Sequence, residues 1–270
     1  MPVLEVRGLS RSFGAVRALH EVDLDVHRHE MLGIIGPNGC GKTTLFNCVS
    51  GRMTPSAGRV HWQGRDVTGW SMQRIARTGL VRTFQESMIF PSASVLQNVE
   101  MAFSISRAHI GSGDGDAQND GDAEGIPSEP PALLDFCGLD AVAGIAAVSL
   151  SFGLVRQLGI ALALAARPRL LMLDEPAAGL NPAESEALAS FLVRLHDAGV
   201  TLCVVDHDMD FLLPLVDRVI VLATGEKLCE GPPEEISRHP EVIEVYLGGR
   251  ASAAPTPAPS SDAATGGSHG

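Results

Sequence analysis

The sequence predicts an α/β protein with a mostly parallel sheet, a preceding antiparallel β layer and a helical subdomain. The first observation is a set of short apolar runs whose length suits buried strands: 31–35, 170–173, 201–205 and 218–222. The second is that helix-compatible stretches, such as 42–49, 152–167 and 182–198, follow or separate these runs. Buried strands alternating with helices are typical of parallel sheets joined by right-handed crossovers.

The N-terminal part predicts the antiparallel layer. Residues 3–26 alternate between apolar and polar side chains, most clearly from Val22 to Val26. The continuous apolar run 31–35 follows, then a glycine-rich turn and the helix 42–49. We therefore expect the order strand, loop, helix directly after the antiparallel layer.

The middle of the chain predicts a helical subdomain at about 86–166, inside one folded domain of 1–250. Stretches 72–107 and 132–166 have helical character. Between them, residues 110–131 are rich in Gly, Asp and Pro, and we expect a disordered acidic loop. Residues 251–270, rich in Ala, Pro, Ser and Gly, predict a disordered tail.

Composition excludes several classes of protein. The chain has 270 residues, 45 % of them hydrophobic, which is enough for a substantial core. Its formal net charge of −12 argues against a nucleic-acid-binding face. The five cysteines are scattered, which suggests neither a disulfide framework nor a zinc site and fits a reducing cytosol. No apolar stretch is long enough to cross a membrane, and no signal peptide is evident at the N-terminus.

A phosphate-binding motif follows the strand at 31–35. Residues 36–43 read G-P-N-G-C-G-K-T and satisfy G-x-x-x-x-G-K-[ST] between a buried strand and a helix. Backbone N–H groups and the helix N-terminus bind polyphosphate in such a loop, and a Thr hydroxyl holds Mg²⁺. The chain has only two lysines, Lys42 and Lys227, and the compact ammonium of Lys42 suits the loop. The predicted nucleotide-binding residues here are Gly36, Asn38, Gly39, Cys40, Gly41, Lys42, Thr43 and Thr44. The alternative for the whole motif is a simple glycine-rich turn between strand and helix.

Cys40 lies inside this motif, near the expected helix N-terminus. Its thiol is either a reactive thiolate favoured by that position or simply a small side chain that fits the turn.

Two acids follow the strand 170–173. Asp174 is predicted to hold Mg²⁺, and Glu175 to accept a proton from the water that attacks the γ phosphate. An acidic strand-to-loop turn is the alternative. His207 follows the next strand, so its imidazole is expected at the same sheet edge near the γ phosphate or the attacking water. The Gln85 amide is a further candidate for Mg²⁺ or water.

Together these motifs resemble the ATP-binding cassette (ABC) ATPases over about residues 3–249. The signature L-S-G-G-Q is matched in part at 150–154, L-S-F-G-L. The resemblance implies a P-loop fold with a mixed RecA-like sheet and ATP and Mg²⁺ as cofactors. It further implies that Phe13 stacks on adenine, that Gln85 is the Q-loop glutamine and that His207 is the switch histidine. Ser151 and Gly153 would bind the γ phosphate held by a second ABC subunit, identical or different.

Local sequences, such as R-T-F-Q at 82–85 and D-E-P-A-A-G-L-N-P at 174–182, resemble the ATP-binding subunits of branched-chain amino acid importers. That resemblance implies a cytoplasmic ATPase on the inner face of the membrane. Its partners would be two transmembrane permease subunits and, indirectly, an extracytoplasmic substrate-binding protein. Urea or lipid transport, and a nucleotide-dependent regulator outside transport, are the alternatives. Leu154, Gly159 and Leu162 depart from the pattern and make the helix after the signature less polar than in the family.

Overall fold

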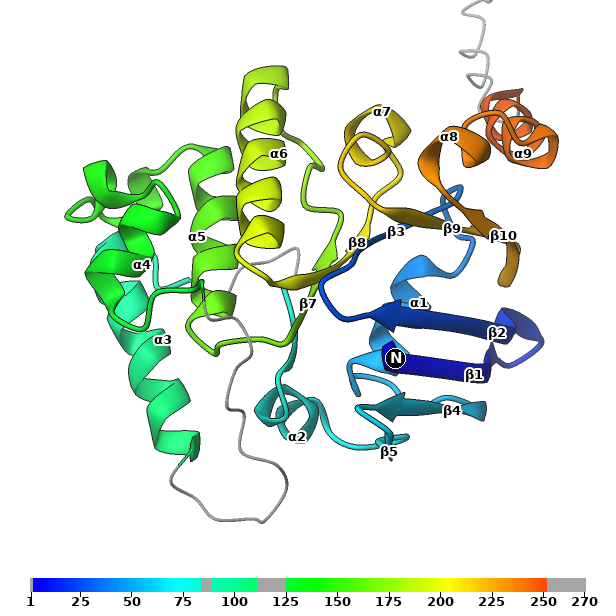
Figure 1. The fold of residues 1–270 in the computed structure, drawn as a ribbon, viewed down its shortest axis with the longest axis horizontal. Coiled ribbons are helices and arrows are strands. Elements are labelled where there is room, and N and C mark those ends of the chain that lie inside the picture. The colour runs from blue at the N-terminus through cyan, green and yellow to red at the C-terminus, as the bar shows by residue number, and fades with distance from the viewer. Residues whose placement is uncertain (1, 84–88, 111–124, 252–270) are drawn as a thin grey trace, which may run out of the picture.

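The computed structural model describes residues 2–83, 89–110 and 125–251. Two sheets organise it (Figure 1). The first has the strand order β2-β1-β4-β5, and its members are β1 (Pro2–Phe13), β2 (Val16–His27), β4 (Ala57–Trp62) and β5 (Arg65–Asp66). All its pairings are antiparallel, as the alternation over residues 3–26 predicts for its first two strands.

The second sheet is mixed and has the order β10-β9-β3-β8-β7-β6. Its strands are β3 (Met31–Ile35), β6 (Leu80–Arg82), β7 (Leu170–Asp174), β8 (Thr201–Val205), β9 (Arg218–Ala223) and β10 (Glu226–Gly231). Five strands run parallel, and β10 pairs antiparallel with β9. The carboxyl ends of β3, β7 and β8 therefore lie at one edge, where α/β sheets place their ligands.

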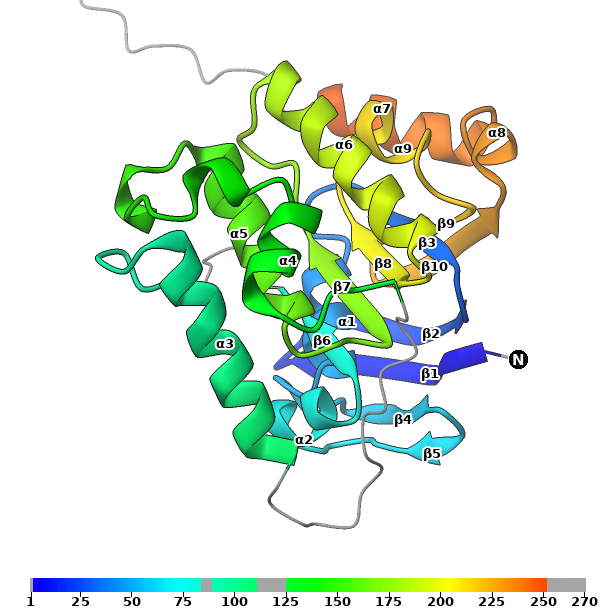
Figure 2. The ribbon, with the colours of Figure 1, turned by 60° about the vertical axis from the view of Figure 1, so that its left-hand side comes forward.

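Helices cover the mixed sheet and extend from it (Figure 2). They are α1 (Lys42–Val49), α2 (Met72–Arg77), α3 (Val95–Ile110), α4 (Pro130–Phe136), α5 (Phe152–Leu164), α6 (Pro182–Asp197), α7 (Met209–Leu212), α8 (Pro233–Ile236) and α9 (Pro240–Ala251). Two 3₁₀ turns, Asp140–Val142 and Ala147–Ser149, precede α5. In both ribbon views α3, α4 and α5 lie together at the side opposite the antiparallel sheet.

The core has two parts, one on each face of the mixed sheet. Leu32 and Ile34 of β3 pack in the cluster that contains α1 and the antiparallel sheet. Met31 and Ile35, on the other face, pack in the cluster that contains α5 and α6. Because side chains alternate along a strand, the fully apolar β3 serves both clusters. The strand as a whole is therefore packed on both faces, and its last residue, Ile35, directly precedes the phosphate-binding motif.

The structure corrects several sequence expectations. The stretch 72–107, expected to be helical, contains the strand β6, which pairs in parallel with Leu170–Met172 of β7. Helix α2 ends before it, and Gly79 has a positive φ of 92° that breaks the helix. Helix α5 ends at Leu164 rather than Arg167, whose φ of 51° is left-handed. Helix α4 begins at Pro130, inside the expected acidic loop.

Other expectations lie outside the described residues. Most of the acidic loop (111–124) and all but the first residue of the tail (252–270) belong to this group. The limits of the helical subdomain stay a prediction. Among the described helices, none combines the length and the apolar character needed to cross a bilayer.

Candidate functional site

The loop from Gly36 to Gly41 joins β3 to α1 and takes a conformation that requires glycine. Gly36 has a φ of 154°, and a side chain on it would collide with the carbonyl oxygen of Leu222. Gly41 has a φ of 109°, and a side chain there would collide with the carbonyl oxygen of Ala18. The loop thus folds tightly against β9 and β2 and delivers the next residue, Lys42, as the first of α1.

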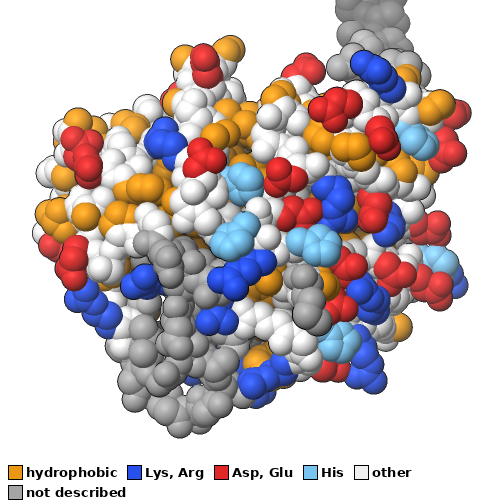
Figure 3. Space-filling view, in the orientation of Figure 1, with side chains coloured by type: hydrophobic (Ala, Val, Ile, Leu, Met, Phe, Trp, Pro, Cys, Tyr) orange, Lys and Arg blue, Asp and Glu red, His pale blue; other side chains and the backbone are white. Residues whose placement is uncertain are grey.

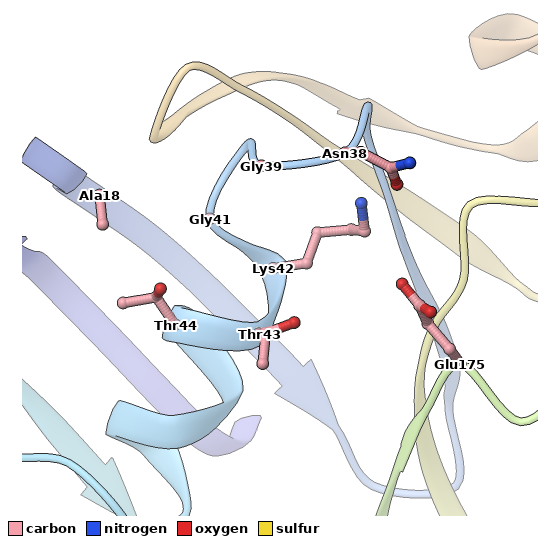
Figure 4. A pocket seen from close by; sticks show the side chains of 8 residues that line it. All are labelled: Ala18, Asn38, Gly39, Gly41, Lys42, Thr43, Thr44 and Glu175. Atoms are coloured by element: carbon pink, nitrogen blue, oxygen red, sulfur yellow. The ribbon is translucent and has the colours of Figure 1, made fainter. Parts of the chain in front are cut away.

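A cavity of about 130 Å³ opens at this loop (Figure 4). Its lining residues are Ala18, Asn38, Gly39, Gly41, Lys42, Thr43, Thr44 and Glu175. The ammonium of Lys42 is held inside the loop, where Nζ donates to the carbonyl oxygens of Gly36 (2.6 Å) and Pro37 (3.1 Å). A cation at the N-terminus of a helix makes the cavity suited to a polyphosphate.

The end of β7 brings the two predicted acids next to the cavity. Asp174 is buried, and its Oδ2 accepts a hydrogen bond from Nη2 of Arg82 at 2.6 Å. Its other oxygen, Oδ1, is buried and has no hydrogen-bond partner among the described residues. Glu175 lines the cavity and has a left-handed φ of 46°, with its N–H bonded to the carbonyl oxygen of Val205. The left-handed turn separates the two carboxyl groups, so one stays buried and the other faces the cavity.

His207 lies at the same edge, after β8. Its Nδ1 is 3.9 Å from Oε1 of Glu175 and 3.5 Å from Oδ1 of Asp206. Its side chain is half-exposed, at 49 %. Asp206 is completely buried and accepts the backbone N–H groups of His207 (2.8 Å) and Asp208 (3.0 Å). Asp206 therefore shapes the turn that holds the imidazole beside Glu175.

Three further predicted residues, Ser151, Gly153 and Phe13, are not among those that line this cavity. Ser151 caps α5, and its Oγ accepts the N–H of Leu154 at 3.4 Å. The N–H of Gly153 donates to Oε1 of Glu184 on α6 at 3.1 Å. Phe13, at the end of β1, is 45 % exposed. Gln85 lies outside the described residues.

Cys40 does not have the environment of a reactive thiolate. Its side chain is buried, with Sγ 3.9 Å from Nζ of Lys42. Burial raises the pKa of the Cys40 thiol, although the charge of Lys42 opposes this effect. Burial of the thiol favours the alternative that Cys40 is a small residue that fits the turn, because desolvation outweighs the nearby positive charge.

Sequence reasoning missed three polar residues at the site. Arg82 at the end of β6 reaches Asp174, and Asp206 organises the turn before His207. Arg156 of α5 is the third: burial lowers the pKa of its guanidinium, and the negative charges of Asp174, Asp206 and Glu175 oppose that shift. The three share no spacing or pattern. Only their position at an acidic sheet edge identifies them.

The oxygen atoms at this edge fit a magnesium ion. They are Oδ1 of Asp174, buried and unbonded among the described residues, and the hydroxyl of Thr43 at the cavity. Within the described ranges there is no cluster of three or more His, Cys, Asp or Glu side chains that could hold a metal on its own. Magnesium typically uses one or two protein groups and completes its shell with water and substrate phosphates.

Comparisons with known proteins agree with this geometry. The model of a family described as "ABC transporter" matches residues 19–178, and one described as "Branched-chain amino acid ATP-binding cassette transporter" matches residues 226–252. The chain is 36 % identical over 261 residues to the high-affinity branched-chain amino acid transport ATP-binding protein BraF of Pseudomonas aeruginosa. It is also 36 % identical over 250 residues to the protein LivG of Escherichia coli, which carries the same description. Each match covers 92 % of this chain and 98 % of the relative.

Solved structures give the same result for the fold. The ADP conformation of an ATP-binding cassette of an ABC transporter superposes with a TM-score of 0.78 at 26 % identity. A nucleotide-free ATP-binding cassette from an ABC transporter superposes with a TM-score of 0.76 at 28 % identity. The two matches cover 92 % and 91 % of this chain, and 99 % of each solved chain.

Proposed function

Because the chain belongs to the ATP-binding cassette family of transporter ATPases, we propose that it is the ATP-hydrolysing subunit of a branched-chain amino acid importer. The observation that carries the amino acid assignment is the second family match, over residues 226–252, which covers β10, α8 and α9. Two relatives described as branched-chain amino acid transport proteins align with 92 % of the chain and support it.

The site residues divide the chemistry of ATP hydrolysis between them. Lys42 and the backbone of the loop bind the β and γ phosphates, exchanging the carbonyl contacts of the ammonium for phosphate oxygens. Glu175 accepts a proton from the attacking water, and His207 beside it orients that water or the γ phosphate. Thr43 and Asp174 would hold Mg²⁺, which neutralises developing phosphate charge when bound.

A second cassette completes the site in this proposal. Ser151 and Gly153 lie at the N-terminus of α5 and take no part in lining the cavity of their own chain. A hydroxyl and backbone N–H groups at a helix N-terminus suit an anion from outside the chain, which would replace Oε1 of Glu184 as the acceptor at the Gly153 N–H. ATP bound in one subunit would therefore contact the α5 terminus of another, identical or different, and draw the two subunits together.

An exposed apolar surface supports contact with membrane permeases. Phe90, Ile145 and Val148 are 54 %, 42 % and 72 % exposed, and they precede α3 and α5. The space-filling view shows hydrophobic side chains gathered over the side formed by α3 to α5 (Figure 3). Apolar side chains grouped in this way mark interaction surfaces. We place two transmembrane permease subunits here, with the chain on the inner face of the cell membrane and a substrate-binding protein on the other side.

The test is transport by the assembled complex. The chain is co-expressed with permease subunits of a branched-chain amino acid importer and reconstituted in vesicles with ATP at the cassette side. The vesicles are then supplied with the substrate-binding protein and labelled leucine. Uptake should require ATP and should disappear with Lys42→Ala. ATP-dependent uptake of urea or a lipid, without uptake of leucine, would contradict the amino acid assignment and leave the transporter assignment standing. Failure to recover any permease with the chain would contradict the transporter assignment itself.

A further inference from the structure

Arg82 forms hydrogen bonds with two elements of the nucleotide site, helix α1 and the end of strand β7. Its side chain is 3 % exposed, and Nη2 donates to Oδ2 of Asp174 at 2.6 Å. Its Nη1 donates to Oδ1 of Asn47 at 2.8 Å and to Oγ of Ser50 at 3.2 Å. Asn47 belongs to α1 and Ser50 caps its C-terminus, so one guanidinium ties the end of β7 to the helix that begins at the phosphate-binding loop.

These contacts fix the orientation of the Asp174 carboxylate. A guanidinium is a planar fork that can donate in two directions at once, so Arg82 is itself held by α1 while it binds Oδ2. Rotation of the carboxylate would break a charge-assisted bond between two buried groups, which is costly. The position of the other oxygen, Oδ1 of Asp174, is consequently fixed as well. This oxygen has no hydrogen-bond partner among the described residues.

We propose that Arg82 is a positioning residue that holds Oδ2 of Asp174 so that Oδ1 remains directed at the divalent cation that accompanies ATP. This inference rests on the proposed ATPase function. It predicts that loss of Arg82 weakens binding of the divalent cation, whereas electrostatic repulsion alone predicts tighter binding. Loss of a positive charge near a cation site should tighten cation binding, whereas loss of the held carboxylate should weaken it.

The experiment measures Mn²⁺ binding by electron paramagnetic resonance to the full chain saturated with the non-hydrolysable analogue β,γ-imido-ATP. Arg82→Met is expected to weaken Mn²⁺ affinity at least fivefold and to approach the loss caused by Asp174→Asn. The double variant should bind Mn²⁺ no more weakly than Asp174→Asn alone, because both changes remove the same interaction. Metal-free binding of the analogue should stay unchanged in Arg82→Met.

Two further variants keep the test decisive. Arg59→Met makes the same chemical change in an exposed arginine paired with Asp66, and it should leave Mn²⁺ affinity at the parent value. Arg82→Lys retains the positive charge without the planar guanidinium, and it should weaken Mn²⁺ affinity about threefold. This variant replaces Arg82→Met in the experiment if Arg82→Met does not fold. Parent-like or tighter affinity in a folded Arg82 variant would overturn the positioning role. Absence of analogue binding by the parent chain would instead overturn the proposed ATPase.

Discussion

At the residue scale, Lys42 is the group on which we expect nucleotide binding to depend. Its ammonium is buried and is satisfied by the carbonyl oxygens of Gly36 and Pro37. An alanine there leaves these carbonyl oxygens without their hydrogen-bond donor and a bound polyphosphate without a counter-charge. We expect Lys42→Ala to lose detectable ATP binding and turnover in calorimetry and phosphate-release assays.

The matched control for this prediction is Lys227→Ala. Lys227 is the chain's other lysine, and its Nζ pairs with Glu230 at 2.9 Å on the exposed side of β10. This variant should bind and hydrolyse ATP as the parent chain does. Equal activity of Lys42→Ala and Lys227→Ala would remove Lys42 from the site.

A substitution at Glu175 is expected to affect ATP hydrolysis without affecting ATP binding. Glu175→Gln removes the proposed proton acceptor but keeps the size of the side chain at the cavity. Because a general base contributes roughly 10²- to 10⁴-fold, turnover should fall by at least about a hundredfold while ATP affinity is retained. Steady-state hydrolysis and nucleotide titration of the same preparation measure the two effects. Turnover within about threefold of the parent would mean that another group takes the proton.

Cys40 predicts a pH dependence of alkylation. Because burial raises the pKa of the Cys40 thiol, the folded chain keeps it protonated at neutral pH, and thiolate forms only as the pH rises well into the alkaline range. Iodoacetamide at pH 7 should label Cys40 more slowly in the folded chain than in the urea-unfolded chain, and mild peroxide should leave ATPase activity unchanged. Mass spectrometry of the Cys40 peptide measures labelling. Equal labelling rates at pH 7 would contradict the buried, neutral thiol.

At the element scale, sequence patterns predict the inner strands and miss the edges. β3, β7, β8 and β9 are apolar on both faces, so a continuous apolar run marks each one. The edge strand β10 has exposed and half-exposed side chains, and β6 has only three residues, so neither has a recognisable pattern. The same limit applies to the site, where motifs predict residues adjacent in sequence but not the pair of Arg82 and Asp174, which are 92 positions apart.

A partly buried ion pair predicts how strongly the two sheets stabilise each other. Arg218 at the start of β9 donates through Nε to Oε1 of Glu30 at 2.8 Å and through Nη2 to the carbonyl oxygen of Asp25 in β2 at 2.7 Å. Arg218→Met leaves Glu30, which is 8 % exposed, with the backbone N–H of His27 at its Oε2 but without its charged partner. Hydrogen bonds to charged groups contribute about 2 kcal/mol, so urea denaturation should show a decrease of about that size in the free energy of unfolding.

The control for the ion pair is the double variant Glu30→Gln with Arg218→Met. Because it removes both charges, it should be more stable than Arg218→Met alone, by about 1 kcal/mol or more. The comparison separates the cost of an unpaired buried carboxylate from the loss of packing by the arginine side chain. A double variant less stable than the single one would show that packing dominates.

At the scale of the whole molecule, the fold holds the residues that we propose to act on ATP in two separate places. The mixed sheet gathers the phosphate-binding loop, Glu175 and His207 at one edge, whereas Ser151 begins α5 in the helical part and lies outside the cavity lining. Figures 1 and 2 show the helical part projecting to the side opposite the antiparallel sheet. In the proposed function, each chain supplies the phosphate-binding loop of one site and the α5 N-terminus of another. Pairing with a second cassette would therefore give each ATP a complete set of contacts.

This division predicts complementation between two inactive variants. Lys42→Ala has an intact α5 terminus, and Ser151→Arg has an intact phosphate-binding loop, so each alone should be inactive as a dimer of identical copies. In the mixed dimer, the intact loop of one copy faces the intact α5 terminus of the other, while the second site carries both changes. Random mixing of equal amounts should therefore restore about a quarter of the parent ATPase activity, because half of the dimers are mixed and each has one working site. A mixture no more active than its components would show that two copies of this chain do not share their sites, and the same test would then be made with a different cassette as the partner.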